Sequence, residues 1–141
     1  GGAYGCMCSF SDQGDSMFVT YRDPNLSESY KVYDEAADYV VDFDADDRDM
    51  KKYIIGTIGS MDMPMEAVDM GARSFHAYFL GKTEADLQKV RDQVLSCTQE
   101  DIRALAPIVK AVVEAGNRCC IGNEEKIDQN KEYFDEVKHV L

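Results

Sequence analysis

The sequence predicts an α+β fold in which several helices pack on one face of an antiparallel sheet. At the start of the chain, apolar residues alternate with smaller ones, which is the period of a β-strand. Between residues 25 and 115 they recur at steps of three and four, which is the period of an amphipathic helix. A short late strand is expected at residues 118–121. Strands therefore come first and near the end, with helices between and after them.

The first two strands are expected to form a β-hairpin. Alternation over residues 4–10 predicts the first strand, and residues 17–21 are rich in side chains that favour strands. Residues 11–16 are polar and contain a glycine, which is typical of a connecting turn. Pro24 ends the second strand, because proline cannot donate a hydrogen bond to a ladder.

Five helices are predicted between the hairpin and the late strand. Thr83 and Thr98 each precede an acidic turn, in which the threonine accepts from a free backbone N–H and the acid favours the positive end of the helix dipole. Pro107 should kink or divide the last of the five helices. A final acidic helix begins at Glu124. The five helices between the hairpin and the late strand are expected from Asn25 or Ser27 to about Val41, from about Asp46 to Thr57, from a break at residues 59–64 to Gly81, from Thr83 to Leu95 and from Thr98 to Gly116.

The chain is expected to be one domain over residues 1–141, with no internal repeat and no linker. Its 141 residues are enough to bury one hydrophobic core. Three strands nevertheless make a thin sheet for so many helices. We therefore expect a segment before residue 1, and a domain that is part of a larger one.

The composition restricts the partners. The formal net charge is −12, and acidic residues are concentrated at residues 34–49 and 124–136. Such a field repels phosphate backbones and anionic lipid, so we expect no nucleic acid and no membrane among the partners. No apolar run approaches the roughly 20 residues of a membrane-spanning helix. The charge favours cationic peptides as partners; the alternative is that an acidic surface only keeps the protein in solution.

The cysteines indicate a reducing compartment. An odd number with an adjacent pair argues against a disulfide framework, so we expect a cytoplasmic protein, with an organelle matrix as the alternative. Convergence of three thiols could bind a soft metal, but free cysteine is also a common small core residue, and this choice stays open. The five are Cys6, Cys8, Cys97, Cys119 and Cys120.

No catalytic metal site is predicted within the chain. A zinc site needs three or four convergent ligands, whereas His76 and His139 are far apart and belong to no His-x-x-Glu-His or His-Glu-x-x-His motif. His76 is expected to be a packed or partly exposed residue of an apolar helix. Arg22 is expected to form an ion pair with Asp23 within the turn after the hairpin.

Two motifs resemble a known family. Gly-Gly-Ala-Tyr-Gly at residues 1–5 is followed, after the hairpin, by Tyr-Arg-Asp-Pro-Asn at residues 21–25. Together they resemble the last domain of the presequence-protease family, which belongs to the pitrilysin and insulinase group of zinc peptidases. Thr-Gln-Glu-Asp-Ile-Arg-Ala-Leu at residues 98–105 and Ile-Gly-Asn-Glu-Glu-Lys-Ile at residues 121–127 extend the similarity over nearly the whole chain.

The resemblance implies an enzyme whose two halves close around a peptide. Zinc and the general-base glutamate belong to a His-x-x-Glu-His motif in the N-terminal half, and that motif is absent from these residues. The implied partners of this chain are therefore the peptide substrate and the N-terminal catalytic half of the same polypeptide, with zinc bound outside the chain. The C-terminal half supplies a tyrosine and an arginine to the substrate. Tyr4 matches the tyrosine, and the matching arginine is expected a few residues before Gly1.

We therefore expect the C-terminal, non-metal-binding part of a zinc endopeptidase that degrades unstructured peptides. It forms part of the chamber wall and offers Tyr4 as its catalytic and substrate-binding residue, because a phenol O–H can stabilise negative charge on the substrate carbonyl oxygen. The parent protein is expected to be an enzyme and this part alone inactive. Tyr4 is otherwise only a strand aromatic.

Two other functions stay open. The first is a catalytically inactive structural or peptide-binding subunit of the same group. The second is an unrelated acidic adaptor, which requires residue 1 to be the true start. An exposed sheet edge is also expected to pair with a second copy and to give a homo-oligomer.

Overall fold

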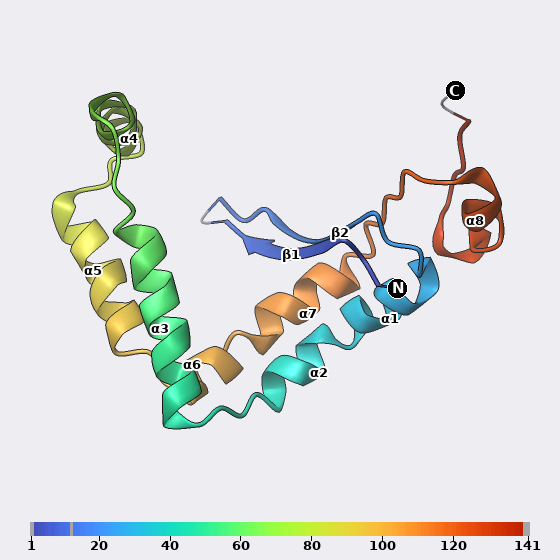
Figure 1. Cartoon of the computed structure of the whole chain (residues 1–141), viewed down its shortest axis with the longest axis horizontal. Helices are drawn as coiled ribbons and strands as arrows, with labels where there is room; N and C mark the ends of the chain where they lie inside the picture. Colours follow the sequence, from blue (N-terminus) through green and yellow to red (C-terminus); the bar gives the residue numbers. More distant parts are fainter. Residues whose placement is uncertain (1, 12, 140–141) are drawn as a thin grey trace. The chain divides into compact units, whose positions relative to one another are not determined.

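The computed structural model describes residues 2–11 and 13–139, which form two compact units (Figure 1). The first, called the hairpin unit here, comprises Gly1–Asp42 and Leu105–Leu141. The second, the helical unit, comprises Phe43–Ala104. The α+β class is confirmed. That residues 1–141 make a single domain stays a prediction.

The hairpin unit begins with the predicted β-hairpin, which is confirmed. β1 (Gly5–Phe10) pairs antiparallel with β2 (Ser16–Tyr21), from Gly5 opposite Tyr21 to Phe10 opposite Ser16. Gly14 in the connecting turn has a φ of +90°, a conformation that favours glycine. The pairing brings the two outer ends of the hairpin, at residues 4 and 22, close together.

Two short helices follow the hairpin where one longer helix is predicted. α1 (Leu26–Asp34) ends at a turn centred on Glu35, whose φ and ψ are −86° and −4°, and α2 (Ala36–Val41) follows. Ala37 in α2 is buried, and α2 packs against α7 (Ala106–Glu114). The helical stretch ends at Val41 as predicted, but one continuous helix is wrong, because the helix is interrupted at Glu35.

The second part of the hairpin unit carries α7, α8 (Glu124–Asp128) and the short 3-10 helix η1 (Lys131–Tyr133). Pro107 lies in the first turn of α7, where its missing N–H breaks no helical hydrogen bond. The helix predicted to begin at Thr98 is therefore divided ahead of Pro107, as expected.

The helical unit consists of four helices. α3 (Asp47–Met61) packs against α5 (Glu84–Leu95), and Arg91 Nη2 donates to Asp62 Oδ2 at 2.8 Å. α4 (Ala67–Phe79) lies between them in sequence, and α6 (Gln99–Arg103) ends the unit. A helix end was expected near Thr57, but α3 continues for another turn. The Ser60 hydroxyl donates to Gly56 O at 3.1 Å there, and helical glycine costs only about 1 kcal/mol.

Both predicted capping signals form complete capping boxes. The Asp86 N–H donates to Thr83 Oγ1 at 3.2 Å, and the Thr83 N–H donates to Asp86 Oδ2 at 2.8 Å. Thr98 and Asp101 make the same pair of bonds, at 3.2 and 2.8 Å. Two backbone donors at each helix start are therefore satisfied locally, without tertiary contacts.

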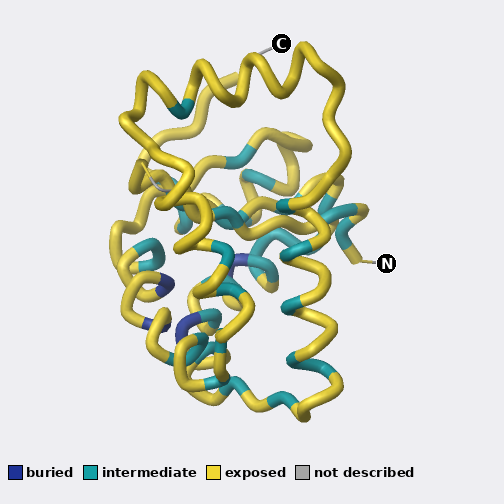
Figure 2. Tube along the Cα trace, turned by 90° about the vertical axis from the view of Figure 1, so that its left-hand side faces the viewer, coloured by how far each residue is buried: buried dark blue, intermediate teal, exposed yellow. Residues whose placement is uncertain are grey.

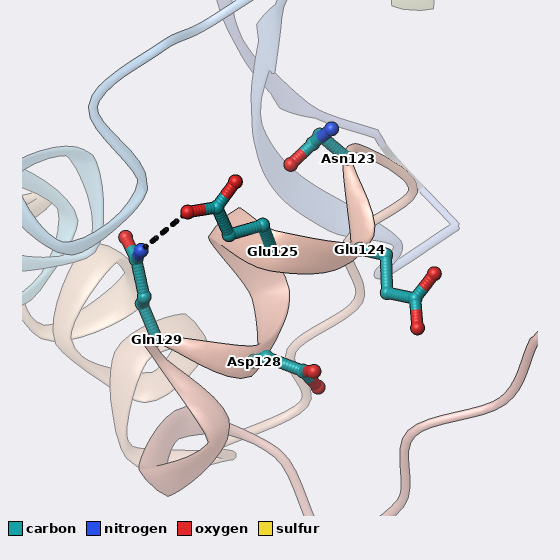
Figure 3. A pocket seen from close by; sticks show the side chains of 5 residues that line it. All are labelled: Asn123, Glu124, Glu125, Asp128 and Gln129. Atoms are coloured by element: carbon teal, nitrogen blue, oxygen red, sulfur yellow. Dashed lines mark hydrogen bonds between the residues drawn. The ribbon is translucent and has the colours of Figure 1, made fainter.

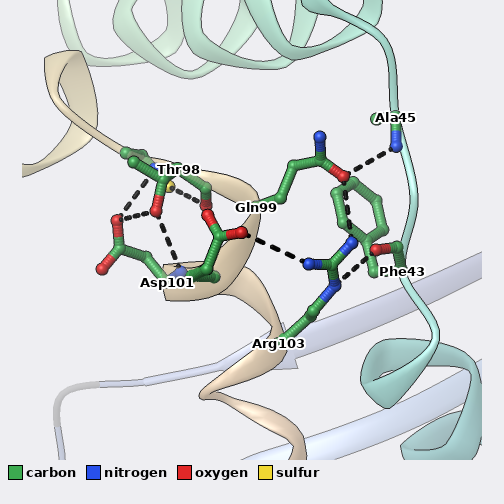
Figure 4. A network of polar contacts seen from close by, with 8 residues as sticks. Phe43, Ala45, Thr98, Gln99, Asp101 and Arg103 are labelled. Atoms are coloured by element: carbon green, nitrogen blue, oxygen red, sulfur yellow. Dashed lines mark hydrogen bonds and ion pairs between the residues drawn. The ribbon is translucent and has the colours of Figure 1, made fainter.

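α6 also fastens the segment that enters the helical unit (Figure 4). Arg103 Nε donates to the carbonyl oxygen of Phe43 at 2.8 Å, and the N–H of Ala45 donates to Gln99 Oε1 at 3.0 Å. These bonds join residues about 60 positions apart, so they connect the first residues of the helical unit to its last helix.

The late strand predicted at residues 118–121 is not formed. Within the part of the chain that the structure describes, the only sheet is the two-stranded hairpin. Side chains hold this segment instead: Arg118 Nη2 donates to Asp34 Oδ1 at 2.9 Å, and the Tyr30 hydroxyl donates to Cys119 O at 3.3 Å. A strand needs a ladder partner, and the segment has none among the described residues.

Few side chains are buried (Figure 2). The accessible surface is 11306 Å², whereas two separate compact proteins of these sizes would expose only about 8,800 Å² together. Large apolar side chains in both units are therefore left in water, among them Ile121 at 92% exposure. The buried apolar residues among those described, all in the hairpin unit, are Tyr30, Ala37, Ala106 and Val109.

Replacing Thr98 by alanine should lower the free energy of unfolding by about 1 kcal/mol, because the Asp101 N–H loses its acceptor. Urea titration followed by circular dichroism measures the change. Thr98→Ser keeps the hydroxyl and serves as the control. Equal losses in the two variants would show that the methyl group, rather than the cap, stabilises α6.

Candidate functional site

Tyr4 lies at the open end of the hairpin. Its N–H donates to Tyr21 O at 3.0 Å, and its ring meets the Tyr21 ring edge-on, with centroids 6.1 Å apart. The side chain is nevertheless 80% exposed. The backbone hydrogen bond therefore holds the main chain of Tyr4 in place, while its phenol stays accessible to a ligand.

Arg22 lies directly beside this tyrosine. Its guanidinium carbon is 5.3 Å from the centroid of the Tyr21 ring and 6.0 Å from that of Tyr4, which is the range of cation–π attraction. Its φ is +50°, so the backbone takes the left-handed conformation that residues other than glycine seldom adopt. Tyr4, Tyr21 and Arg22 together are called the hairpin-end cluster below.

Asp23 is occupied by the following turn. Its Oδ1 accepts from the Asn25 N–H at 2.9 Å, and its Oδ2 accepts from the Ser29 hydroxyl. Partial burial acts to raise the pKa of this carboxyl, but hydrogen bonds from Ser29, Asn25 and Thr20 outweigh it and hold the pKa below its usual range. The predicted Arg22–Asp23 ion pair is therefore wrong, because the carboxylate accepts from Asn25 and Ser29 in the turn before α1 instead.

The two faces of the hairpin differ. Phe18 points toward α1 and stacks on Tyr33, with ring centroids 5.4 Å apart. The other face is open and apolar, and Tyr21 joins it to the hairpin-end cluster. This open face is formed by the exposed side chains of Met7, Met17, Val19 and Tyr21.

Arg118 forms a second, different arginine cluster. Its guanidinium carbon lies 5.3 Å from the Tyr30 ring and 5.5 Å from the Tyr133 ring, and Nη2 donates to both carboxylate oxygens of Asp34 at 2.9 and 3.2 Å. Burial raises the pKa of Tyr30 to about 12, so this phenol stays protonated and donates to Cys119 O. The cluster ties the end of the chain to α1.

The environment of three cysteines disfavours the thiolate. Burial raises the pKa of Cys8, Cys97 and Cys120, which favours the inert thiol over the thiolate. All five are free; Cys6, Cys8 and Cys119 are exposed, and Cys97 and Cys120 are half-buried. Among residues 2–11 and 13–139, no three His, Cys, Asp or Glu side chains are arranged to hold a metal ion.

A shallow hollow near the end of the chain is acidic (Figure 3). Its carboxylates point in different directions, and several already have partners. Gln129 Nε2 donates to Glu125 Oε1 at 3.3 Å, and Lys131 lies 2.8 Å from Asp128. The hollow therefore offers no convergent set of ligands.

The sequence interpretation identified Tyr4 through the resemblance but missed its neighbours. The sequence pairs Arg22 with Asp23, and it places Tyr21 in the second strand and in the family motif without a role beside Tyr4. The available signal was the register: a tight pairing of residues 5 and 21 places residue 4 next to the end of β2. The backbone at Arg22 is left-handed, and the guanidinium lies over both rings.

Comparison with known proteins gives a consistent result. Residues 1–123 match the family model described as PreP C-terminal domain. The chain is 40% identical over its whole length to Protein HypA of Clostridium perfringens, covering 14% of that protein. It is 33% identical over its whole length to presequence protease 1, chloroplastic/mitochondrial, of Arabidopsis thaliana, covering 13% of it. Over 89% of the chain it is 34% identical to mitochondrial presequence protease of Aspergillus fumigatus, covering 12%.

Asp23→Asn should lower the free energy of unfolding at pH 7, because the amide accepts less strongly from the Ser29 and Asn25 donors. The folded-state pKa of Asp23 lies below its unfolded value, so its stabilisation is full above about pH 4 and is lost as the pH falls through the folded pKa. Urea titrations between pH 2.5 and pH 7 should show the two proteins converging in acid. A constant difference across this range would contradict the assignment.

Proposed function

Because the chain belongs to the PreP C-terminal domain family, we propose that it is the C-terminal part of a zinc-dependent endopeptidase that degrades unstructured peptides. In this proposal the chain forms part of the wall of the substrate chamber and offers Tyr4 to the substrate. The observation that carries the proposal is the position of Tyr4, held by its backbone at the hairpin end with its phenol 80% exposed.

The phenol has a definite chemical role. Hydrolysis of an amide develops negative charge on the former carbonyl oxygen, and a placed O–H donor stabilises that charge. Tyr4 donates this hydrogen bond, while Tyr21 and Arg22 pack against its ring. The contribution of the chain is therefore to orient the substrate and stabilise charge.

Zinc belongs elsewhere in this proposal. The described residues of the chain do not fit a zinc site, since no three potential ligands among them converge. The N-terminal half of the same polypeptide is proposed to bind the metal and to supply the base. No step of hydrolysis is assigned to a metal held by this chain.

Exposed apolar surface supports a place within a larger protein. The chain spans about a seventh of the length of the curated relatives that it matches. Its own elements leave 11306 Å² of surface accessible, including apolar side chains of both units. Surfaces of this kind mark interfaces. The N-terminal half of the polypeptide is the proposed partner for them, and the alternative is a second copy that pairs with an edge of the hairpin.

The remaining partners follow from charge. A net charge of −12 favours cationic peptides as substrates and disfavours nucleic acid and anionic lipid. Among the residues that the structure describes, no helix combines the length and apolar character that crossing a membrane requires. Two relatives are named as mitochondrial or chloroplastic proteins, which supports an organelle matrix over the cytoplasm as the compartment.

A second candidate is a catalytically inactive structural or peptide-binding subunit of the same group. It is favoured by the lack of converging metal ligands among the described residues, which makes hydrolysis depend on another part of the polypeptide. The two candidates differ in one respect. The peptidase loses its activity to a chelator and regains it with zinc, whereas the subunit binds peptides without hydrolysing them.

Tyr4→Phe in the full-length polypeptide should lower kcat by about 10²- to 10³-fold, because the oxyanion donor is lost while the ring remains. The measurement is steady-state hydrolysis of an unstructured, quenched fluorogenic peptide. Tyr78→Phe is the matched control, since Tyr78 is 81% exposed and lies in the helical unit. Unchanged kcat in Tyr4→Phe would leave only a wall-forming role for this part of the chain.

A further inference from the structure

We infer that Arg22 is a substrate-binding residue, whose guanidinium donates hydrogen bonds to a carbonyl or carboxylate oxygen of the peptide beside Tyr4. This inference rests on the proposed function and adds a cation to the substrate contacts of the chain. Three observations support it. The guanidinium donors of Arg22 have no partner among the described residues, two tyrosine rings hold the guanidinium in place, and the Asp23 carboxylate is bonded to other residues.

A comparison of two arginines within the hairpin unit supports the assignment. Arg22 and Arg118 each lie over two tyrosine rings, at 5.3 and 6.0 Å and at 5.3 and 5.5 Å. Arg118 also binds both oxygens of Asp34, so its charge is satisfied within the fold. For Arg22, no hydrogen bond or ion pair joins the guanidinium to any residue in the ranges 2–11 and 13–139. The donors of Arg22 are therefore available to a ligand.

The nearest acid cannot satisfy Arg22. Asp23 accepts from Asn25 and Ser29, and these bonds hold its pKa low and its carboxylate within the turn. Neither β1 nor β2 contains a charged residue, although the chain has 27 acidic residues. Arg22 therefore carries the one full charge of the hairpin-end cluster, next to an apolar face that an extended peptide can cover.

The geometry suits an oxygen acceptor. Cation–π contacts on two rings restrict where the guanidinium can point, and its planar donors match a carboxylate or pair with carbonyl oxygens. The left-handed backbone at Arg22 costs conformational energy, which is typical of residues retained for a function. A peptide bound here would meet the Tyr4 hydroxyl and the Arg22 donors from the same end of the hairpin.

The test uses the full-length polypeptide and a ten-residue unstructured peptide, made with a free and with an amidated C-terminus. Arg22→Ala should lower kcat/KM by tenfold or more, mainly through a higher KM. Arg22→Lys should recover part of the loss, and millimolar guanidinium should restore Arg22→Ala. Loss with both peptides identifies a main-chain carbonyl as the acceptor, and loss with the free acid alone identifies the terminal carboxylate.

Arg118→Ala is the matched control. It should lower the melting temperature, because Asp34 loses its partner, while kcat/KM stays within about threefold of wild type. Arg22→Ala should show the opposite pattern. A kcat/KM within twofold of wild type for Arg22→Ala would overturn the inference, as would a loss that tracks melting temperature and resists guanidinium.

A second assay separates this inference from the proposed peptidase activity. If the wild-type polypeptide does not hydrolyse the peptide, calorimetric binding of the same peptide replaces KM. Weaker binding by Arg22→Ala then supports the inference without the peptidase. Equal binding by the two proteins, or no binding by wild type, rejects it.

Discussion

The main physical constraint on this chain is that it buries too little of its own apolar surface. Helix caps, the hairpin ladder and scattered ion pairs define its local structure, but these are weak sources of stability when apolar side chains stay in water. The buried apolar residues among those described belong to the hairpin unit, and many large side chains in both units stay exposed. The chain spans about a seventh of the length of the relatives it matches, and our proposal is that the rest of such a polypeptide covers the exposed faces.

The residues proposed to contact the substrate lie where the local structure is best defined. The ladder from β1 to β2 fixes Tyr4 against Tyr21, and the bonds of Asp23 fix the turn that follows. Between them, the left-handed residue Arg22 folds its cation back over both rings. One short hairpin therefore presents a phenol and a guanidinium together, and Tyr21 and Arg22 also line a hollow of the hairpin unit. That arrangement suits a residue pair that meets a substrate held mainly by another part of the protein.

The sequence predicted what short-range physics determines. Thr83 and Thr98 carry their own capping partners, Pro107 forbids a continuous helix, and alternation defines the hairpin. The sequence-based predictions were wrong where the structure depends on a contact with another segment. Residues 118–121 have strand character, but no strand pairs with them among the described residues. Asp23 accepts a hydrogen bond from the Ser29 hydroxyl rather than pairing with its neighbour Arg22. Tyr4 came from a family resemblance, whereas its neighbours follow only from register and backbone conformation.

The central claim is that a longer polypeptide covers the apolar surface that this chain leaves exposed. The most direct test is hydrogen–deuterium exchange, measured on the isolated chain and on the same residues in the full-length polypeptide. Backbone amides in β2 and at residues 118–122 are predicted to exchange quickly in the isolated chain and to gain at least a hundredfold protection in the longer protein. Equal protection in both would contradict the account, since it would show that the chain needs no further surface to complete its fold.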